Sequence, residues 1–462
     1  MRLRSLLAGV AVLAMSASLC ATSALQADTT DSGGPAISPA LVAEIRAKSR
    51  VRSIIQLKPG HSVQAVASDV EKASEGSRVV ESARSDRFFV AELDDSTLAT
   101  LRKDVRVQAV YKDELLPAIL DASTNVIRST QANQAGWTGS GTTVAVLDTG
   151  IDRDHPFFAG RLVDEACFSS SDAAEGTVSL CPNNQASQLG AGAADAETAQ
   201  CLVDGANACS HGSHVTGIAA GRRAAGAPSD GVAPAAGIMA IQVFNRVDDA
   251  LRCTAAGTRA PCFLSYVSNQ KLALEHVARV ARTHNVAAVN MSLGGGGPFS
   301  EPCDADADAA ALKPEFDALV AAGVAPVVAA GNHGFQNGVA MPACISSAIA
   351  VGATDDADAL APFTNRGPLL DFFAPGVNIN ASVPDDTYRQ MSGTSMSAPH
   401  VAGAFALMRQ AYPDFTVAQS LQRLRNTGTP IRFDAAGTPV STPRIDVERA
   451  TSEARAPADP RV

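Results

Sequence analysis

Five apolar runs between residues 142 and 353 show almost no alternation of polar and apolar positions, and segments with helical spacing separate them. Unbroken runs of this kind are typical of parallel strands that are covered on both faces. The pattern therefore predicts an α/β domain with a doubly wound, mostly parallel sheet, which we place at residues 118–450. The runs are TTVAVLD (142–148), GIMAIQVF (237–244), VAAVNMSL (286–293), APVVAAGN (325–332) and AIAVGA (348–353).

A smaller region precedes this domain, and in it short strand and helix patterns alternate. Such alternation predicts a two-layer α+β domain at residues 51–117. Residues 28–50 are mostly polar and small and are interpreted as a linker, whereas residues 451–462 have no apolar pattern and are expected to form a disordered tail. The predicted strands are 51–58, 88–93 and 105–114, and the predicted helices are 61–74 and 95–104.

Residues 1–27 have the composition of a secretion signal. Arg2 and Arg4 come before an apolar run, and small residues follow it. The run is shorter than the roughly 20 apolar residues that a membrane-spanning helix needs, so we expect no stable membrane anchor. The sequence predicts export of the remaining chain, to the extracellular medium or to the periplasm.

Charge and cysteine content agree with export. The net charge is -10 and no basic cluster occurs in the body of the chain, which argues against a nucleic-acid partner. Of nine cysteines, Cys20 lies in the predicted signal, and the others favour disulfide bonds in an exported protein. Zinc is the alternative, but no CxxC pair occurs. Many pairings are open, among them a local bond between Cys253 and Cys262.

Candidate chemistry gathers where predicted strands end and where helices begin. MSGTSMSAPH (391–400) carries four hydroxyls at the start of an apolar helix, where unpaired N–H groups favour developing negative charge. Asp148 ends the first strand of the predicted sheet, and His211 and His214 stand at the head of another helix. Asn332 ends a further strand with an amide that can donate a hydrogen bond. Sites in open α/β sheets gather beyond the carboxyl ends of strands, which is where these groups lie.

Five short motifs occur along the chain in a fixed order: VLDTGID (146–152), HGSHVTG (211–217), NMSLGGG (290–296), AAGN (329–332) and GTSMSAPHVAG (393–403). With these motifs the chain resembles the subtilisin family of serine proteases (subtilases) from about residue 141 to 450. The resemblance implies that Ser395, directly after Gly-Thr, is the nucleophile, that His211 is the base and that Asp148 orients the imidazole. It also implies that Asn332 and the backbone N–H of Ser395 bind the oxyanion, and that His214 is a packed residue.

The same resemblance implies how substrate and regulator bind. Ser292, Leu293 and Gly294 would pair as an edge strand with the main chain of a protein or peptide substrate, which predicts broad endopeptidase activity without a catalytic cofactor. Residues 51–117 are similar to the propeptide of these enzymes, a small ferredoxin-like domain that assists folding and then inhibits. Self-cleavage would fall between residues 117 and 135, and we expect the enzyme to be a monomer.

Two features depart from the family pattern. Phe157 stands where many members have a calcium-binding Asp, so no metal ligand is assigned and a structural calcium ion is left open. The stretch between Asp148 and His211 is longer than in small members and contains four cysteines, which predicts a surface insertion pinned by disulfides. The alternative function is a catalytically silent binding or adhesion protein with the same fold.

Overall fold

The computed structural model describes residues 34–454, except residues 39–40, 43, 46–47, 75–76, 82–86, 114 and 118–125. The predicted signal peptide lies outside the described residues, as do residues 118–125 of the predicted processing region and residues 455–462 of the predicted tail. The described residues all belong to one compact unit, Gly34–Val462. Across these described ranges, every helix is too short or too polar to cross a membrane.

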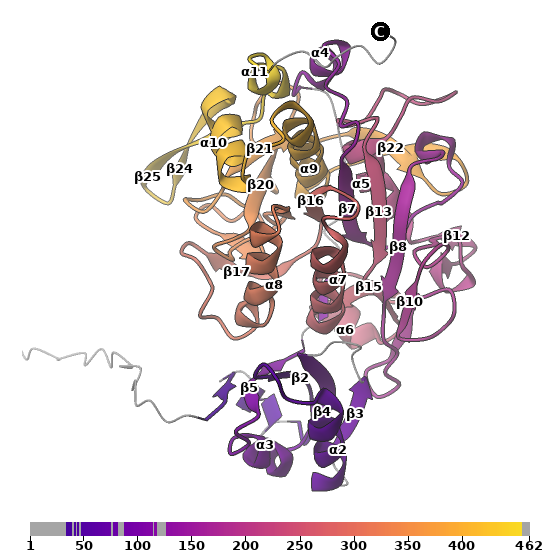
Figure 1. The fold of residues 1–462 in the computed structure, drawn as a ribbon, viewed down its shortest axis with the longest axis vertical. Coiled ribbons are helices and arrows are strands. Elements are labelled where there is room, and N and C mark those ends of the chain that lie inside the picture. Colours follow the sequence, from indigo (N-terminus) through magenta and orange to yellow (C-terminus); the bar gives the residue numbers. More distant parts are fainter. Residues whose placement is uncertain are drawn as a thin grey trace, which may run out of the picture. The chain divides into compact units, whose positions relative to one another are not determined.

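A ten-stranded sheet forms the centre of the larger domain (Figure 1). Each strand from β8 to β25 pairs in parallel with its neighbour, and only the outermost strands, β10 and β24, run antiparallel to theirs. The prediction of a mostly parallel sheet is therefore confirmed. In spatial order the strands are β10 (Ser187–Leu189), β8 (Leu162–Phe168), β13 (Gly237–Gln242), β7 (Thr143–Asp148), β16 (Val286–Met291), β18 (Ala325–Ala329), β20 (Ile349–Thr354), β21 (Phe372–Pro375), β25 (Thr438–Arg444) and β24 (Thr429–Ala435).

Helices cover both faces of this sheet, because alternate side chains of a strand point to opposite sides. In β7, Val144 and Val146 pack into one core with residues of α5 (Ser210–Ala220) and α9 (Thr394–Ala411). Ala145 and Leu147 pack into a second core with residues of α7 (Val267–Val280) and α8 (Ala309–Ala321). Helices α5 and α9 also pack against each other, so the beginnings of both lie on the same face.

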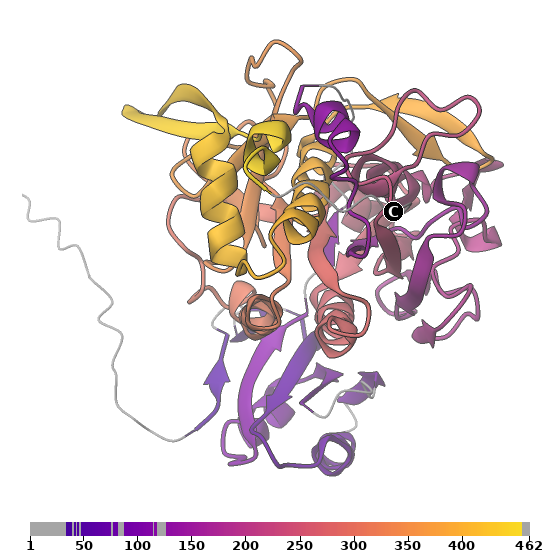
Figure 2. The ribbon, with the colours of Figure 1, turned by 45° about the horizontal axis from the view of Figure 1, so that its top comes forward.

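The remaining elements of the larger domain are short and lie around the sheet. Figure 2 shows the β24–β25 hairpin, in yellow, at one edge. The helical segments are α4 (Ser129–Gln134), η1 (Pro156–Phe158), η2 (Ala199–Cys201), α6 (Ala250–Ala255), α10 (Val417–Thr427) and α11 (Val447–Thr451). The strands are β9 (Thr177–Ser179), β11 (Leu202–Val203), β12 (Ala206–Asn207), β14 (Asn245–Val247), β15 (Cys262–Tyr266), β17 (Gly295–Phe299), β19 (Val339–Met341), β22 (Ile379–Val383) and β23 (Thr387–Met391).

The N-terminal domain contains a mainly antiparallel sheet and the helices α2 and α3. Its strands follow the spatial order β5-β2-β4-β3, and β1 (Ala36–Ile37) adds a parallel fifth strand beside β5. Both helices begin at a side-chain cap: Ser62 Oγ accepts a hydrogen bond from Ala65 N–H, and Asp94 Oδ1 accepts one from Thr97 N–H. The elements are β2 (Val51–Leu57), α2 (Val63–Ala73), β3 (Arg78–Glu81), β4 (Phe88–Leu93), α3 (Asp95–Leu101) and β5 (Val107–Lys112).

The segment interpreted as a linker differs from that expectation. Residues 36–37 form β1, and Leu41 and Ile45 follow in helical backbone. Leu41 is 0% exposed and Ile45 is 3% exposed, and both belong to the core of the N-terminal domain. Two apolar residues at i and i+4 lie on the same side of a helical turn and can attach a short segment to a sheet face. The mostly polar composition of residues 28–50 therefore did not indicate this attachment.

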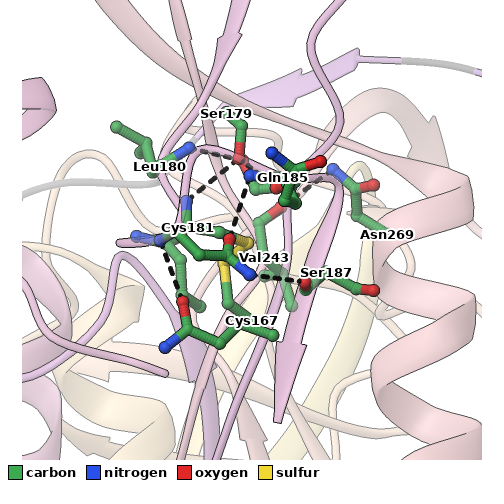
Figure 3. The surroundings of a disulfide bond; sticks show 12 residues. Cys167, Ser179, Leu180, Cys181, Gln185, Ser187, Val243 and Asn269 are labelled. Atoms are coloured by element: carbon green, nitrogen blue, oxygen red, sulfur yellow. Dashed lines mark hydrogen bonds between the residues drawn. A yellow bond between two sulfur atoms is a disulfide. The ribbon is translucent and has the colours of Figure 1, made fainter. Parts of the chain in front are cut away.

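The insertion between Asp148 and His211 contains two disulfide bonds, as predicted. Cys167 in β8 is bonded to Cys181, and Figure 3 shows the turn that this bond holds. Ser179 Oγ accepts a hydrogen bond from Cys181 N–H at 3.0 Å and donates one to Gln185 O at 2.8 Å. The other disulfides are Cys201–Cys209, Cys253–Cys262 and Cys303–Cys344.

Candidate active site

Strand β7 places Asp148 at the carboxyl edge of the sheet, where it meets His211 from the first turn of α5. His211 Nδ1 lies 2.7 Å from Asp148 Oδ1, which also accepts a 2.7 Å hydrogen bond from Thr149 N–H. Both side chains are buried. Among the described residues, Asp148 Oδ2 has no hydrogen-bond partner. A nearby positive charge stabilises a buried carboxylate whose second oxygen accepts no hydrogen bond. The Asp148 carboxylate is therefore suited to stabilise a protonated His211 imidazole.

Two glycines allow α5 to come close enough for this contact. A Cβ atom on Gly212, directly after His211, would lie 2.0 Å from Gly150 O. Gly150 itself has φ +94°, a backbone conformation that glycine adopts without strain. Gly212 N–H donates a 2.9 Å hydrogen bond to Thr149 Oγ1. A larger residue at either glycine would push the histidine away from the carboxylate of Asp148.

The four hydroxyls at the start of α9 have different surroundings. Ser392 Oγ accepts a backbone N–H at 3.1 Å in a turn, and Ser397 Oγ donates to a strand carbonyl at 3.0 Å. Thr394 Oγ1 is engaged with a neighbouring amide side chain and a backbone N–H. Ser395 Oγ makes one long contact, 3.5 Å to Ser292 O. Of the four, Ser395 is the hydroxyl least committed to holding the fold.

Asn332 follows β18 and is oriented by Thr394. Asn332 Oδ1 accepts hydrogen bonds from Thr394 N–H at 2.9 Å and from Thr394 Oγ1 at 3.0 Å. In the part of the chain that the structure describes, neither Asn332 Nδ2 nor Ser395 N–H donates to a partner. Two donors beside the candidate nucleophile are therefore available to an anion.

The predicted substrate-binding segment lies against the same helix N-terminus. Ser292 Oγ donates a 2.7 Å hydrogen bond to Ser395 O. Leu293 is fully buried, and a Cβ atom on Gly294 would lie 2.5 Å from Met341 O. The segment is thus held between the start of α9 and β19, and the structure brings all the candidate residues named from the sequence to one edge of the sheet.

Two further histidines near the site, His214 and His400, have structural roles. His214 Nε2 lies 3.1 Å from Ile379 O and 2.9 Å from Arg389 O, and burial lowers the pKa of His214 to about 3. His400 Nδ1 lies 2.7 Å from Met396 O, and burial lowers the pKa of His400 to about 4. Both rings therefore stay neutral near neutral pH, in agreement with the interpretation of His214 as a packed residue.

One positioning residue was missed in the sequence. Thr394 holds Asn332 through both its backbone and its side chain. Its hydroxyl was considered only as a possible nucleophile. The clue was its position, because a residue just before the nucleophile at a helix N-terminus can reach a loop from the adjacent strand.

The region around Phe157 is held by aromatic and guanidinium contacts. The Phe157 ring lies edge-on to that of Tyr388, with the ring centroids 5.5 Å apart. Arg161 is buried and donates to Phe157 O at 2.5 Å, to Ala236 O at 3.2 Å and to Ala220 O. Burial lowers the pKa of Arg161 to about 10. The positive charge near Phe157 is thus the guanidinium of Arg161, which donates hydrogen bonds to three main-chain carbonyls.

Three carboxylates form a cluster, in which Asp152 and Asp154 follow shortly after Asp148 and Glu197 comes from later in the chain. Carboxylate oxygens of Asp152, Asp154 and Glu197 all lie within 4.8 Å of one another. Burial, with the negative charge of Glu197, raises the pKa of Asp152 to about 7. Carboxylate oxygens are the ligands that calcium prefers, so this donor set fits a hard divalent cation.

An α/β protein with a serine, a histidine and an aspartate at the carboxyl edge of its sheet falls in the class of serine hydrolases. Residues 139–445 match the Subtilase family, and the chain belongs to that family. Subtilisin E of Bacillus subtilis is 31% identical over 392 residues, which cover 83% of this chain and 87% of that protein. The chain is a serine endopeptidase of the subtilisin type.

Two further relatives show the same similarity. Subtilisin of Bacillus pumilus is 34% identical over 307 residues, 66% of this chain and 89% of that protein. A thermostable alkaline protease of Halalkalibacterium halodurans is 32% identical over 345 residues, 73% of this chain and 77% of that protein.

Proposed function

We propose that the chain is a secreted endopeptidase that is made as a self-processing proenzyme and cleaves proteins with broad specificity through an acyl-enzyme. The observation that carries the proposal is the 2.7 Å contact between His211 Nδ1 and Asp148 Oδ1, on the face where α9 begins with Ser395. The contact leaves Nε2 of the imidazole as the atom that exchanges a proton with the nucleophile.

The proposed reaction uses these groups in two steps. Ser395 Oγ attacks the scissile carbonyl carbon while His211 accepts the hydroxyl proton, and His211 then gives this proton to the leaving amine. Water repeats the sequence on the acyl-enzyme and releases the acid. Asp148 stays ionised and stabilises the imidazolium in both steps. The negative oxygen receives hydrogen bonds from Asn332 Nδ2 and Ser395 N–H.

Broad specificity follows from main-chain recognition. In the proposal, residues 292–294 pair with the substrate backbone, which is common to all peptides. Ser292 is tied to Ser395 by a 2.7 Å hydrogen bond, so the edge that holds the substrate and the group that attacks it form one unit.

The N-terminal domain is proposed to be the propeptide, which assists folding and inhibits. Its βαββαβ order and antiparallel strand order β5-β2-β4-β3 agree with a ferredoxin-like fold. The chain then continues into β6 (Leu115–Pro117), which pairs antiparallel with β15 of the larger domain. The segment thus occupies an edge strand of the larger domain by main-chain pairing, the mode that is also proposed for substrate at residues 292–294, which supports an inhibitory role.

Export and a monomeric state are part of the same proposal. Four disulfides hold loops of the larger domain, and such bonds persist in oxidising compartments. No cofactor takes part in the proposed reaction. A structural calcium ion at Asp152, Asp154 and Glu197 is proposed as a stabiliser, and calcium-dependent protection against heat would test it.

The decisive experiment compares the intact mass and casein hydrolysis of purified wild type and Ser395→Ala. Ser397→Ala is the matched control, because Ser397 lies on the same helix and its hydroxyl donates to a strand carbonyl. We expect wild type and Ser397→Ala to lose the N-terminal domain and to cleave casein, while Ser395→Ala does neither.

Two results would contradict this proposal. Processing and casein hydrolysis by Ser395→Ala at the wild-type rate would show that another hydroxyl is the nucleophile. A correctly folded wild type that neither processes nor reacts with a fluorophosphonate would instead favour the silent binding protein.

A further inference from the structure

The N-terminal domain inserts one arginine fully into the larger domain. The Arg52 side chain in β2 is 1% exposed. Its Nη2 donates a 2.6 Å hydrogen bond to Ser170 Oγ, and Nη1 lies 3.7 Å from Asp172 Oδ2. The guanidinium carbon lies 3.9 Å from the centroid of the Tyr266 ring, a cation–π contact. Ser170, Asp172 and Tyr266 all belong to the larger domain, and we name them the arginine pocket.

The arginine pocket is a built site. Asp172 is 2% exposed, and its Oδ2 accepts no hydrogen bond among the described residues, so a buried negative charge faces the guanidinium. Asp172 Oδ1 accepts a 2.9 Å hydrogen bond from Ala174 N–H, which fixes the carboxylate. Tyr266 is fully buried, and its hydroxyl donates a 3.0 Å hydrogen bond to Glu175 Oε2.

Disulfide bonds lie beside both walls of the arginine pocket. Ser170 and Asp172 are inside the loop closed by Cys167–Cys181, whose surroundings are drawn in Figure 3. Tyr266 ends β15, and this strand begins at a cysteine of the Cys253–Cys262 bond. The walls therefore belong to cross-linked segments that do not depend on the N-terminal domain for their course.

Asp113 forms a second connection between Arg52 and the larger domain. Arg52 Nε donates a 2.6 Å hydrogen bond to Asp113 of its own domain. Asp113 also accepts hydrogen bonds from Ser268 N–H at 2.8 Å and Ser268 Oγ at 2.6 Å, at the start of α7. Two further arginines of the N-terminal domain reach the larger domain but are more exposed. Arg78 Nη2 lies 3.6 Å from Asp172 Oδ1 and its side chain is 57% exposed, whereas Arg87 is 47% exposed and pairs with Glu275 and Glu315. Buried arginines are enriched among the residues that contribute most to interface energies, while exposed pairs contribute little.

We propose that the arginine pocket is a guanidinium-recognition site that controls how long the cleaved N-terminal domain stays bound. The proposal rests on the proposed function, since it needs a chain that processes itself. Arg52 is the ligand in the proenzyme. Release of the domain empties the arginine pocket and removes from the Asp172 carboxylate both the buried guanidinium of Arg52 and the exposed one of Arg78, which slows release. A planar guanidinium stacks on the Tyr266 ring and reaches Ser170 and Asp172 at once, whereas an ammonium group cannot do all three.

The test follows release of the N-terminal domain from the processed full chain. Wild type, Arg52→Lys, Arg52→Met and Arg87→Met are allowed to process, intact mass reports cleavage, and peptide hydrolysis after dilution reports release. We expect both Arg52 variants to shorten the half-time of release by about tenfold or more, and Arg87→Met to change it by less than about threefold.

Two measurements keep the test decisive if an Arg52 variant does not fold. Asp172→Asn keeps the acceptor for Ala174 N–H but removes the charge, and it should also speed release. Methylguanidinium chloride, compared with methylammonium chloride at equal ionic strength, should raise the active fraction of the wild-type complex, because it binds only the emptied arginine pocket.

The outcomes separate this inference from the proposed function. Absence of cleavage in wild type would overturn the proenzyme proposal. Normal cleavage with an unchanged half-time in Arg52→Met, or wild-type behaviour of Arg52→Lys, would overturn the arginine pocket alone. Equal effects of methylguanidinium and methylammonium would show that general charge screening, not guanidinium recognition, governs release.

Discussion

The catalytic edge of the larger domain and its contact with the N-terminal domain are built in different ways. At the catalytic edge, backbone groups at strand ends and helix starts orient the side chains, as Thr149 N–H does for Asp148 and Thr394 N–H does for Asn332. At the contact, long side chains reach across, with Arg52 buried and Arg87 half exposed.

This difference indicates which properties of the enzyme depend on which contacts. Backbone donors belong to the sheet and its helices, so the geometry of the catalytic edge should survive loss of the N-terminal domain. Arginine contacts are individual and replaceable, so single substitutions should tune the association of the domains without disturbing the chemistry. Substitutions at the catalytic edge and at the contact between the domains test this separation.

Asp148→Asn should have the largest effect on activity. The amide cannot stabilise a protonated His211 in the same way, so kcat toward a peptide substrate should fall about 10⁴-fold, with the thermal midpoint almost unchanged. Steady-state kinetics and thermal unfolding measure the two effects. A loss of less than about tenfold would show that the Asp148 contact is only structural.

Lys271→Met should have the largest effect on stability. Lys271 Nζ lies 2.6 Å from Glu315 Oε2, and both side chains are 1% exposed. Burial raises the pKa of Glu315 and lowers that of Lys271, so each ion depends on the other. Removing the lysine should reduce the free energy of unfolding by about 3–5 kcal/mol in urea titrations of the Ser395→Ala background.

Arg87→Met is the control for this second prediction. Arg87 reaches the same Glu315 from the N-terminal domain, but it is 47% exposed, so its loss should cost no more than about 1 kcal/mol. Equal decreases in the free energy of unfolding for Lys271→Met and Arg87→Met would contradict the proposed difference between internal and interdomain charges.

Asn332→Ala should lower kcat by about 10²–10³-fold with little change in KM, because its amide hydrogens act on the transition state. Thr394→Val should have a smaller effect, since Thr394 N–H still orients Asn332 Oδ1. Thr394→Ser keeps the hydroxyl and is the matched control. A raised KM with an unchanged kcat would show that Asn332 contributes to ground-state binding and not to stabilisation of the oxyanion.

A change in stability with pH is expected to be smaller than the effects of replacing Asp148, Lys271 or Asn332. With a chelator present, so that no cation is bound, the raised pKa of Asp152, about 7, means that ionisation of this carboxyl destabilises the folded chain. Its contribution to stability is therefore complete at pH values below its unfolded pKa and is lost as the pH rises toward about 7. Asp152→Asn in the Ser395→Ala background should reduce the loss of unfolding free energy across this pH range by about 1–2 kcal/mol. The same pH dependence of the thermal midpoint in both proteins, between pH 4 and pH 8, would contradict this assignment.

Five strands of the large sheet were predictable from local rules, whereas the roles of the candidate catalytic residues were inferred from the resemblance to the subtilase family and stay predictions. A run such as 142–148 is apolar enough to be buried on both faces, and Asp148 stands out at its end. The motifs around His211 and Ser395 begin helices, as the apolar spacing after them predicted, but the choice among the four hydroxyls and the two histidines needed the family resemblance.

Contacts between distant segments could not be predicted in this way. The attachment of Leu41 and Ile45 depends on a sheet face formed by later residues. The arginine pocket joins positions 52, 170, 172 and 266, and nothing local to Arg52 distinguishes it from other arginines of the chain. The insertion was predicted from its cysteines, but its β8 and β10 strands extend the main sheet as well as lying at the surface.

The Cys303–Cys344 bond has a consequence for an enzyme that can attack its own copies. This bond spans 41 residues that include Asn332. A nick anywhere inside that loop leaves two fragments that are still covalently joined, with Asn332 tethered beside α9. Partly digested molecules would therefore migrate as one band without reductant and as two with it, and autolysis in this loop would not by itself release a piece of the active site.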